Sequence, residues 1–313
     1  MKQLVEIYGT AFAGLVLVLV FVLFAPNFAT AGNLLNVLKD TSFLAILALG
    51  FGLALTIAEL DLSIAEVASL AAVTAGALIQ AKVDPALAAA GGMAVGLSLG
   101  VFNGFGVTVL RVPSLIVTLG TAAIARGLAF MLTQGVAFVG RWPTSFTGLA
   151  RGSIYGVPNL VLWLAGVTGV VYALLKWTRT GARMTATGEA EEAARLSGIA
   201  TARMKRLGLA LSGVLAGLTA VLLAASVSSA APNMAGDYFL YAIAAVLLGM
   251  TMFEPGRPNV AGTVFAAFVL KALGNGLVLM GAAYYVQDIM LGVIIIGSVA
   301  FSAGVVKKAA FKV

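Results

Sequence analysis

The chain has 313 residues, of which 61% are hydrophobic and 10% are charged, and it contains no cysteine and no histidine. A soluble domain carries roughly 25% charged and about 45–50% apolar residues, because its surface needs polar cover. The composition therefore predicts a protein that lies mostly in lipid. Without Cys and His, the sequence excludes disulfides, thiol nucleophiles, zinc fingers, Ser-His-Asp triads and imidazole proton relays.

Apolar runs of about 20 residues, the length that crosses the hydrocarbon core, follow one another along the chain. They predict an all-α, polytopic membrane protein with about ten transmembrane helices, which form a single transmembrane domain over residues 1–313. We expect the first run to be a span and not a cleaved signal peptide, because no good cleavage site follows it. The expected spans are 6–25, 42–58, 63–81, 86–110, 114–133, 157–176, 205–226, 238–253, 259–281 and 285–305.

The net charge of +7 is spread unevenly over the connections between these spans. Lys and Arg gather on the side of the N-terminus, at Lys2, Arg111, Lys176, Arg179, Arg183, Arg195, Arg203, Lys205, Arg206, Arg257, Lys307, Lys308 and Lys312. Positively charged connections mark the cytoplasmic side, so both termini are expected there. The charge thus indicates orientation in the membrane, and nucleic acid is not expected as a partner. The opposite side holds Lys39, Lys82, Arg141 and Arg151.

The loop 177–204 is the longest charged connection, and its pattern predicts an ordered helix. Acidic residues stand at the expected start and Arg195 near the end, as the helix dipole favours, and Gly198 suits the left-handed residue that follows a helix. Two interpretations remain: a helix that docks into a groove on another protein, or a solvated loop helix. The small apolar surface of this helix is formed by Ala193, Ala194 and Leu196.

The same loop resembles a known family. Glu192-Ala193-Ala194 followed by Gly198 is similar to the Glu-Ala-Ala-x-x-x-Gly signature of binding-protein-dependent ABC importer permeases. In that family the loop contacts the ATPase subunit. The resemblance therefore implies an ATPase-coupling role for Glu189, Glu191, Glu192, Ala193, Ala194, Arg195, Leu196, Ser197 and Gly198.

Other motifs resemble the ribose-type branch of the family, in the branched-chain/ribose superfamily. They follow in family order: Asp61-Leu62-Ser63, Asn103-Gly104, residues 112–120 with Arg126-Gly127, 193–199, 211–217, and 275–277 with Gln287. Two places depart from the pattern. Ala58-Glu59-Leu60 stands where the family usually has Gly-Gly, and 253–258 replaces a glycine-rich loop. These departures leave the class intact but weaken any transfer of substrate.

Small residues predict how the spans pack. Gly92, Gly96, Gly100 and Gly104 recur every four residues and so share one helical face, where another backbone can approach closely. A second stripe in the seventh span consists of Gly208, Ser212, Ala216, Ala220 and Ala224.

Two motif pairs suggest an internal repeat. Asn103-Gly104 and Leu119-Gly120 have the same spacing as Asn275-Gly276 and Leu291-Gly292. Five crossings separate the pairs, so spans 2–5 and 7–10 are expected to form an inverted-topology repeat, a common plan of transporters.

The polar residues within or next to the expected spans have two interpretations. Asp61, Ser63, Asn103, Asn275 and Gln287 are candidates for lining the substrate pathway. Alternatively, Ser63 and Glu66 form a capping box that begins the third span, and the amides join helices. Arg126 and Lys271 are expected to pair with a carboxylate or to reach an interface.

The leading hypothesis is the membrane subunit of an ABC importer for a monosaccharide or small polyol, in the bacterial cytoplasmic (inner) membrane, working by alternating access. The chain has no G-x-x-x-x-G-K-[ST] motif, so ATP and Mg are expected on a separate ATPase subunit and no cofactor or enzyme activity on this chain. Further expected partners are a periplasmic or extracellular substrate-binding protein, a second permease copy or paralogue, and membrane lipid. The alternative is a secondary transporter coupled to ions through Glu59, Asp61 or Glu66, while a membrane-embedded enzyme has least support.

Overall fold

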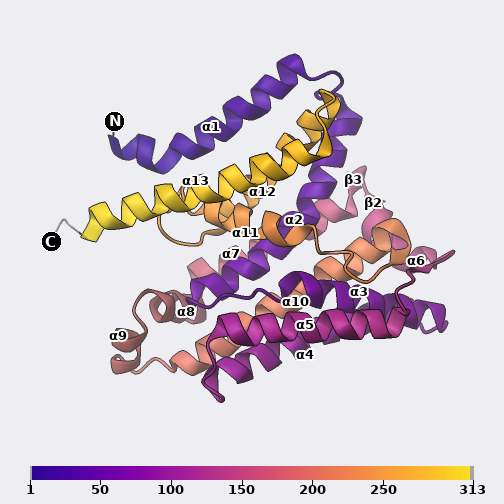
Figure 1. Ribbon diagram of the computed structural model, residues 1–313, viewed down its shortest axis with the longest axis horizontal. Coiled ribbons are helices and arrows are strands. Elements are labelled where there is room, and N and C mark those ends of the chain that lie inside the picture. Colours follow the sequence, from indigo (N-terminus) through magenta and orange to yellow (C-terminus); the bar gives the residue numbers. More distant parts are fainter. Residues whose placement is uncertain (1, 311–313) are drawn as a thin grey trace. The chain divides into compact units, whose positions relative to one another are not determined.

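The structure is a computed structural model that describes residues 2–310, with side chains described from residue 7 to residue 300. Helices make up most of it, and Figure 1 labels them in chain order. They are α1 (Lys2–Phe24), α2 (Ala31–Thr56), α3 (Ile64–Gln80), α4 (Pro85–Thr108), α5 (Ser114–Thr133), α6 (Thr144–Arg151), α7 (Asn159–Trp177), α8 (Arg179–Glu189), α9 (Glu191–Leu196), α10 (Thr201–Val227), α11 (Tyr238–Gly249), α12 (Val260–Leu279) and α13 (Tyr284–Ala310).

Four strands of two residues each qualify the all-α prediction. They form two antiparallel pairs, β1 with β4 and β2 with β3, in connections between helices. Their bounds are β1 (Phe138–Val139), β2 (Ser153–Ile154), β3 (Val157–Pro158) and β4 (Ser229–Ala230).

Among the described residues, seven helices are long and apolar enough to cross a membrane: α1, α2, α4, α5, α7, α10 and α12. Three shorter apolar helices, α3, α11 and the part of α13 up to Ala300, coincide with the remaining expected spans. The segment 42–58 is part of a longer helix, because α2 already begins at Ala31. The fold is thus that of a multi-pass membrane protein, and the number of about ten spans stays a prediction.

The chain consists of two compact units, which we describe separately. Unit 1 comprises residues 1–48 and 240–313, and unit 2 comprises residues 49–239. In unit 1, α1 packs along α12, and the rings of Phe21 and Phe28 lie 5.6 Å apart at the centre of a buried cluster. This packing leaves no room at Gly276 on α12, where a side chain would overlap the Phe21 ring.

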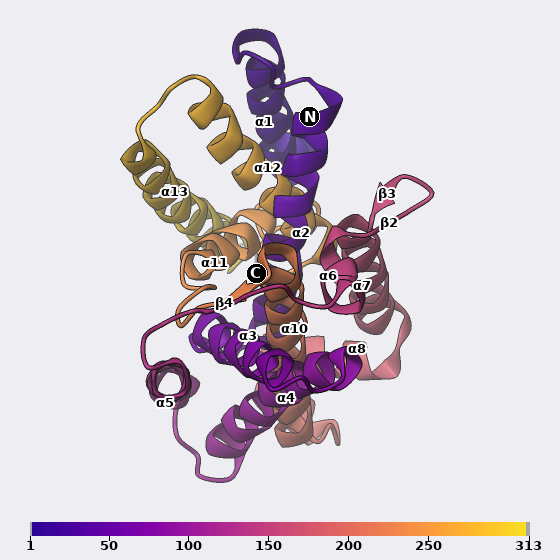
Figure 2. The same ribbon diagram turned by 90° about the vertical axis from the view of Figure 1, so that its right-hand side faces the viewer.

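Unit 2 is built around α10, which contacts α3 and α4 along their lengths, while α5 packs on α3 (Figure 2). The segments 57–63, 109–113 and 178–200 meet at one end of this unit, where Leu60 bonds Ser114 and Arg206 touches Gly104. The β1–β4 pair and Arg151, which bonds the Ser226 carbonyl, lie at the other end. The connections predicted to share a side of the membrane therefore meet within unit 2.

The predicted grouping of positive charges can be compared with the structure for only some of the Lys and Arg residues. Arg141 and Arg151 lie at the β1–β4 end of unit 2 and Arg203 and Lys205 at the opposite end, as expected. The side chains of Lys2, Lys307 and Lys308, and all of Lys312, lie outside the described residues.

The α4–α10 contact confirms the glycine face predicted on α4. A methyl group on Gly96 would lie 2.9 Å from the Gly217 Cα and would clash with the Gly213 carbonyl oxygen. Backbone therefore meets backbone along this interface, which in lipid replaces the hydrophobic drive that joins helices in water. The predicted stripe of small residues on α10 begins on a different face, toward α2. Gly208 lies against Ile57, and the Ser212 carbonyl lies next to Gly50 of α2.

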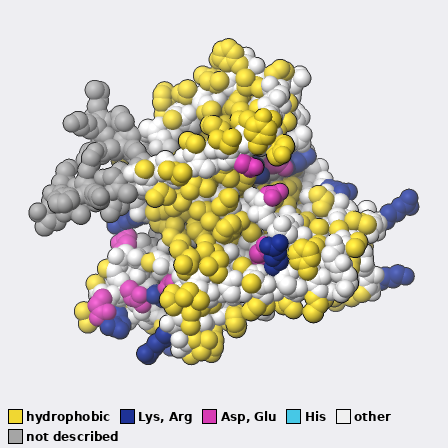
Figure 3. Space-filling view, in the orientation of Figure 1, with side chains coloured by type: hydrophobic (Ala, Val, Ile, Leu, Met, Phe, Trp, Pro, Cys, Tyr) yellow, Lys and Arg dark blue, Asp and Glu magenta, His cyan; other side chains and the backbone are white. Residues whose placement is uncertain are grey.

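Large hydrophobic side chains cover much of the surface, as the face in Figure 3 shows. Phe12 and Phe24 of α1, for example, are 68% and 70% exposed. Exposing such side chains to water costs about 25 cal/mol per Å² of apolar surface, so this surface fits lipid surroundings.

Candidate functional site

Asp61 is the centre of a buried hydrogen-bonded network in the turn between α2 and α3. The side chain is 1% exposed, and its Oδ1 accepts hydrogen bonds from the Ser63 backbone N–H at 3.1 Å and the Ser63 hydroxyl at 2.5 Å. Its Oδ2 accepts a bond from the Ser212 hydroxyl of α10 at 2.7 Å. Three donors satisfy a carboxylate that is removed from solvent, so the turn is held firmly against α10.

The network continues into α4 and α5. The Asn103 amide of α4 donates to the Ser63 hydroxyl at 2.9 Å and accepts from the Thr121 hydroxyl of α5 at 2.6 Å. The Thr118 hydroxyl of α5 accepts from the Leu62 backbone N–H at 3.2 Å. The pathway candidates Asp61, Ser63 and Asn103 thus lie together in one network with internal partners, and their contact with substrate stays a prediction.

The predicted capping box at the start of α3 is wrong. Ser63 is the residue before α3, but its side chain makes no capping bond, because its hydroxyl binds Asp61 and Asn103. The Glu66 Oε2 is buried and has no hydrogen-bond partner among the described residues. Glu66 instead lies within electrostatic range of Arg126. In place of the capping bond, the Ser63 hydroxyl therefore binds Asp61, two positions before it, and Asn103 of α4.

The loop 177–204 contains two helices where one was expected. Thr178 caps α8 by accepting a bond from the Gly181 N–H at 3.0 Å, and α8 runs as far as Glu189. Ala190 then breaks the helix with φ −156° and ψ 82°, and α9 begins at Glu191. Glu189 therefore ends the first helix and does not begin the second.

The end of α9 agrees with the sequence pattern. Gly198 has φ +82°, and the Ile199 N–H bonds the Ala194 carbonyl at 3.0 Å, which is the usual way a glycine closes a helix. Within the helix, Arg195 pairs with Glu192 at 2.7 Å on the exposed side.

The small apolar residues of α9 face two directions. Leu196 is 81% exposed and Ala193 is also exposed, whereas Ala194 is 5% exposed and faces the chain. The surface available for docking therefore consists of Ala193 and Leu196, with Ala194 as the attachment of α9 to its own chain. The ATPase-coupling role of the whole stretch 189–198 stays a prediction.

Lys205 on α10 joins this loop to the α2–α3 turn. Its Nζ lies 2.7 Å from the Glu191 Oε2 of α9 and 2.7 Å from the Glu59 Oε1 of the turn. Sequence reasoning missed this residue, because its charge was assigned to membrane orientation. It also missed Thr121 and treated Ser212 as a packing residue, since nothing local in the sequence identifies their partners.

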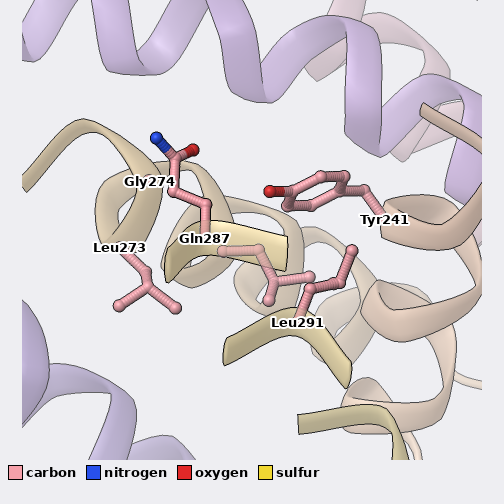
Figure 4. A pocket seen from close by; sticks show the side chains of 6 residues that line it. Tyr241, Leu273, Gly274, Gln287 and Leu291 are labelled. Carbon is pink, nitrogen blue, oxygen red and sulfur yellow. The ribbon is translucent and has the colours of Figure 1, made fainter. Parts of the chain in front are cut away.

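The remaining pathway candidates lie in unit 1. The amides of Asn275 and Asn33 exchange two hydrogen bonds, at 2.8 and 3.0 Å, between α12 and the start of α2. Gln287 of α13 lines a small apolar pocket, where the Tyr241 hydroxyl points toward it (Figure 4). Asn275 thus joins helices, and the contact of either residue with substrate stays a prediction.

The two cations that the sequence analysis singled out inside spans, Arg126 and Lys271, have aromatic neighbours. The Arg126 guanidinium lies 5.9 Å from the Phe130 ring centre, and the Lys271 Nζ lies 5.1 Å from that of Tyr241. Asp40 also lies within electrostatic range of Lys271. Each cation therefore has both a ring and, counting Glu66 for Arg126, a carboxylate in its surroundings.

Comparison with solved structures agrees with the fold. The chain matches, with a TM-score of 0.53 and 14% identity, a chain of an ABC transporter of metal-chelate type in an inward-facing conformation. The match covers 97% of this chain and 99% of the other. At this identity the likeness shows a shared membrane fold only.

Comparison by sequence identifies the family. The model of the family described as branched-chain amino acid transport system / permease component matches residues 33–299. The chain is 35% identical to the ribose import permease protein RbsC of Escherichia coli K12 and 32% to that of Bacillus subtilis 168, covering 90% and 91% of this chain and 89% of each relative. It is 31% identical to the L-arabinose transport system permease protein AraH of E. coli K12, over 94% of this chain and 89% of the relative. The chain therefore belongs to this permease family of ABC transport systems, in its ribose-type branch.

Proposed function

We propose that this chain is the permease subunit of an ABC importer that moves a monosaccharide or a closely related polyol into the cytoplasm. The 35% identity to a ribose import permease over 90% of the chain carries the proposal. A D-allose transport system permease of E. coli is also 30% identical over 94% of the chain, so the relatives take several different sugars. The proposal is therefore the class of substrate and not one sugar.

The proposed energy source is a separate cytoplasmic ATPase that docks on α9. The exposed Ala193 and Leu196 offer a small apolar surface, flanked by the Glu192–Arg195 ion pair, on a helix that projects from the loop. Such a helix suits a groove on a partner protein. Because the chain has no phosphate-binding loop of its own, ATP and Mg would be bound by that partner.

Alternating access is the proposed mechanism, with two halves that are inverted repeats. The described elements support the repeat by their order, because a long helix, a shorter apolar helix and two further apolar helices occur twice: α2 to α5 and α10 to α13. A residue with positive φ also follows the first helix of each set: Ala58, at +56°, comes two residues after α2, and Ser228, at +54°, comes directly after α10. We propose that the half-bundles rock so that a central path opens outward and then inward.

The substrate-binding protein is proposed to dock at the β1–β4 end of unit 2. A cleft of about 400 Å³ opens there between the α3–α4 turn and the segment 139–143. Lys82 and Arg141 line it together with Asp84, whose Oδ1 already accepts hydrogen bonds from the backbone N–H groups of Ala86 and Leu87. The two cations favour an acidic side chain of the partner.

Uptake by purified components tests the whole proposal. The permease, its ATPase and its binding protein are reconstituted in proteoliposomes and offered labelled ribose, arabinose, allose and polyols. We expect ATP-dependent uptake of at least one of them, with both termini on the ATPase side and two permease copies in each complex. Uptake by the permease alone, without ATP, would instead support an ion-coupled secondary transporter.

Binding at the cleft is tested separately. The double variant Lys82→Glu/Arg141→Glu is expected to weaken binding of the substrate-binding protein, more strongly at low salt than at high salt, since steering between charges is screened. Arg151→Gln is the matched control at the same end of unit 2. Unchanged affinity of the double variant would move the docking surface elsewhere.

A further inference from the structure

Lys205 stands between two segments that have different proposed tasks. Glu191 begins α9, the proposed docking helix, and Glu59 belongs to the same turn as Asp61. We infer that Lys205 is a positioning residue on α10 that transmits displacement of α9 to the α2–α3 turn, and through the buried network to α4 and α5. This inference rests on the proposed function, because it assumes that the ATPase moves α9.

Few contacts attach α9 to the rest of the chain, so the Lys205–Glu191 ion pair is important for holding it. The helix has six residues, and Ala194 is its one buried side chain. The Glu192–Arg195 pair stays within α9 and therefore holds it to nothing else. Among the described residues, the Lys205–Glu191 pair is thus the ion pair that joins α9 to a membrane helix.

Burial makes the other half of the bridge harder to break. The side chains of Glu59 and Lys205 are 9% and 17% exposed, whereas that of Glu191 is 49% exposed. A buried carboxylate that loses its partner keeps an uncompensated charge, which is strongly unfavourable. If Lys205 follows Glu191, Glu59 must therefore follow Lys205, and the turn moves with α9.

A second contact acts in the opposite direction. Gly188, near the end of α8, lies directly against the Thr56 carbonyl, and a methyl group there would be 3.1 Å from the Ala58 nitrogen. The loop therefore touches the turn by backbone packing and is tied to it by charge. Movement of the loop toward the turn pushes through α8, and movement away from it pulls through Lys205.

One arm of the bridge, Glu59, lies where this chain departs from the ribose-type pattern that it resembles. Glu59 occupies a position where the family pattern usually has glycine, which has no side chain to pair with Lys205. The unusual residue at this position of Ala58-Glu59-Leu60 thus forms an ion pair with Lys205. It connects the loop to a turn that the Asp61 network already fixes to three helices.

Site-specific labelling of the cysteine-free chain tests the inference. Leu60→Cys places a thiol in the turn at a position that is 38% exposed. The permease is assembled with its ATPase in nanodiscs, and the rate of maleimide labelling is measured without nucleotide and after trapping with ATP and vanadate. Coupling energies of this kind change such an equilibrium by roughly twofold to thirtyfold.

The measured quantity is the ratio of the labelling rates with trapped nucleotide and without nucleotide. In the Leu60→Cys background we expect this ratio to differ clearly from one, and with Lys205→Met added we expect it to return to about one. Arg203→Met is the matched control, because Arg203 is exposed on the same helix and makes no ion pair with a described residue. Inverting all three charges, Glu59→Lys with Lys205→Glu and Glu191→Lys, should restore the effect. If Lys205→Met does not fold, Glu59→Gln removes the same arm without leaving a buried charge.

Three results would overturn the inference. They are an unchanged nucleotide effect in Lys205→Met, a triple variant no better than Lys205→Met, and loss of the ATPase from the Lys205→Met complex on co-purification. The labelling uses no sugar. A Lys205-dependent nucleotide effect in a complex that transports none of the sugars would therefore refute the proposed substrate class and leave the bridge standing.

Discussion

Replacing Leu196 tests whether α9 docks on an ATPase. Full burial of a leucine side chain is worth about 1.5–3 kcal/mol, and 81% of this side chain is still exposed in the permease alone. Leu196→Ala retains the Cβ, so it should cost about 1–2 kcal/mol of binding free energy per docking helix. This corresponds to a roughly five- to thirtyfold higher Kd for the ATPase subunit.

The Kd is measured by biolayer interferometry with the permease in nanodiscs and the ATPase in solution. Leu110→Ala is the matched control, because Leu110 is 59% exposed in the connection 109–113, at the same end of unit 2. Its effect should stay below about twofold, since a lone exposed leucine on a protein surface is ordinary. A Kd for Leu196→Ala within this range, or equal losses in both variants, would refute docking through α9.

Three further predictions concern stability in detergent, measured as thermal unfolding. Gly96→Ala should lower the free energy of unfolding by about 3 kcal/mol, at the upper end for overpacking, because the added methyl group clashes with backbone. Gly120→Ala is the control, because space there is open, and equal effects of the two variants would disprove the close α4–α10 contact. Asp61→Asn should cost about 1–3 kcal/mol, since its new N–H₂ group faces hydrogen-bond donors, and an unchanged melting temperature would contradict the network. Ala58→Gly should gain up to about 1 kcal/mol by relieving φ +56°, and a loss would show that this strain is absent.

Local periodicity in the sequence predicted the features that depend on neighbouring residues. The four-residue spacing of glycines in α4 placed them on one face, and the structure packs that face on α10. The acidic start of α9 and the left-handed Gly198 also followed from rules that operate within one turn of helix. Such rules hold here because no distant group competes for the same atoms.

Distant partners explain what the sequence could not reveal. The Ser63 hydroxyl matched a capping rule, but in the folded chain it binds the neighbouring Asp61 and also Asn103, 40 positions away. Asp61 in turn binds Ser212, 151 positions away. Similarly, Lys205 has the charge expected of a cytoplasmic residue, and its bridge between Glu59 and Glu191 appears only when α9, α10 and the turn come together.

The glycine contact between α4 and α10 also limits when this part of the protein can assemble, because it needs both helices. Helix α4 leaves the ribosome long before α10 does, and until then Gly96, Gly100 and Gly104 lack the helix that covers them. Lipid chains cannot reproduce a backbone contact that excludes even a methyl group, so this face stays without its partner during synthesis. A chain that is truncated before Thr201 is therefore expected to insert its first helices and yet be removed by membrane proteases as an unfinished product.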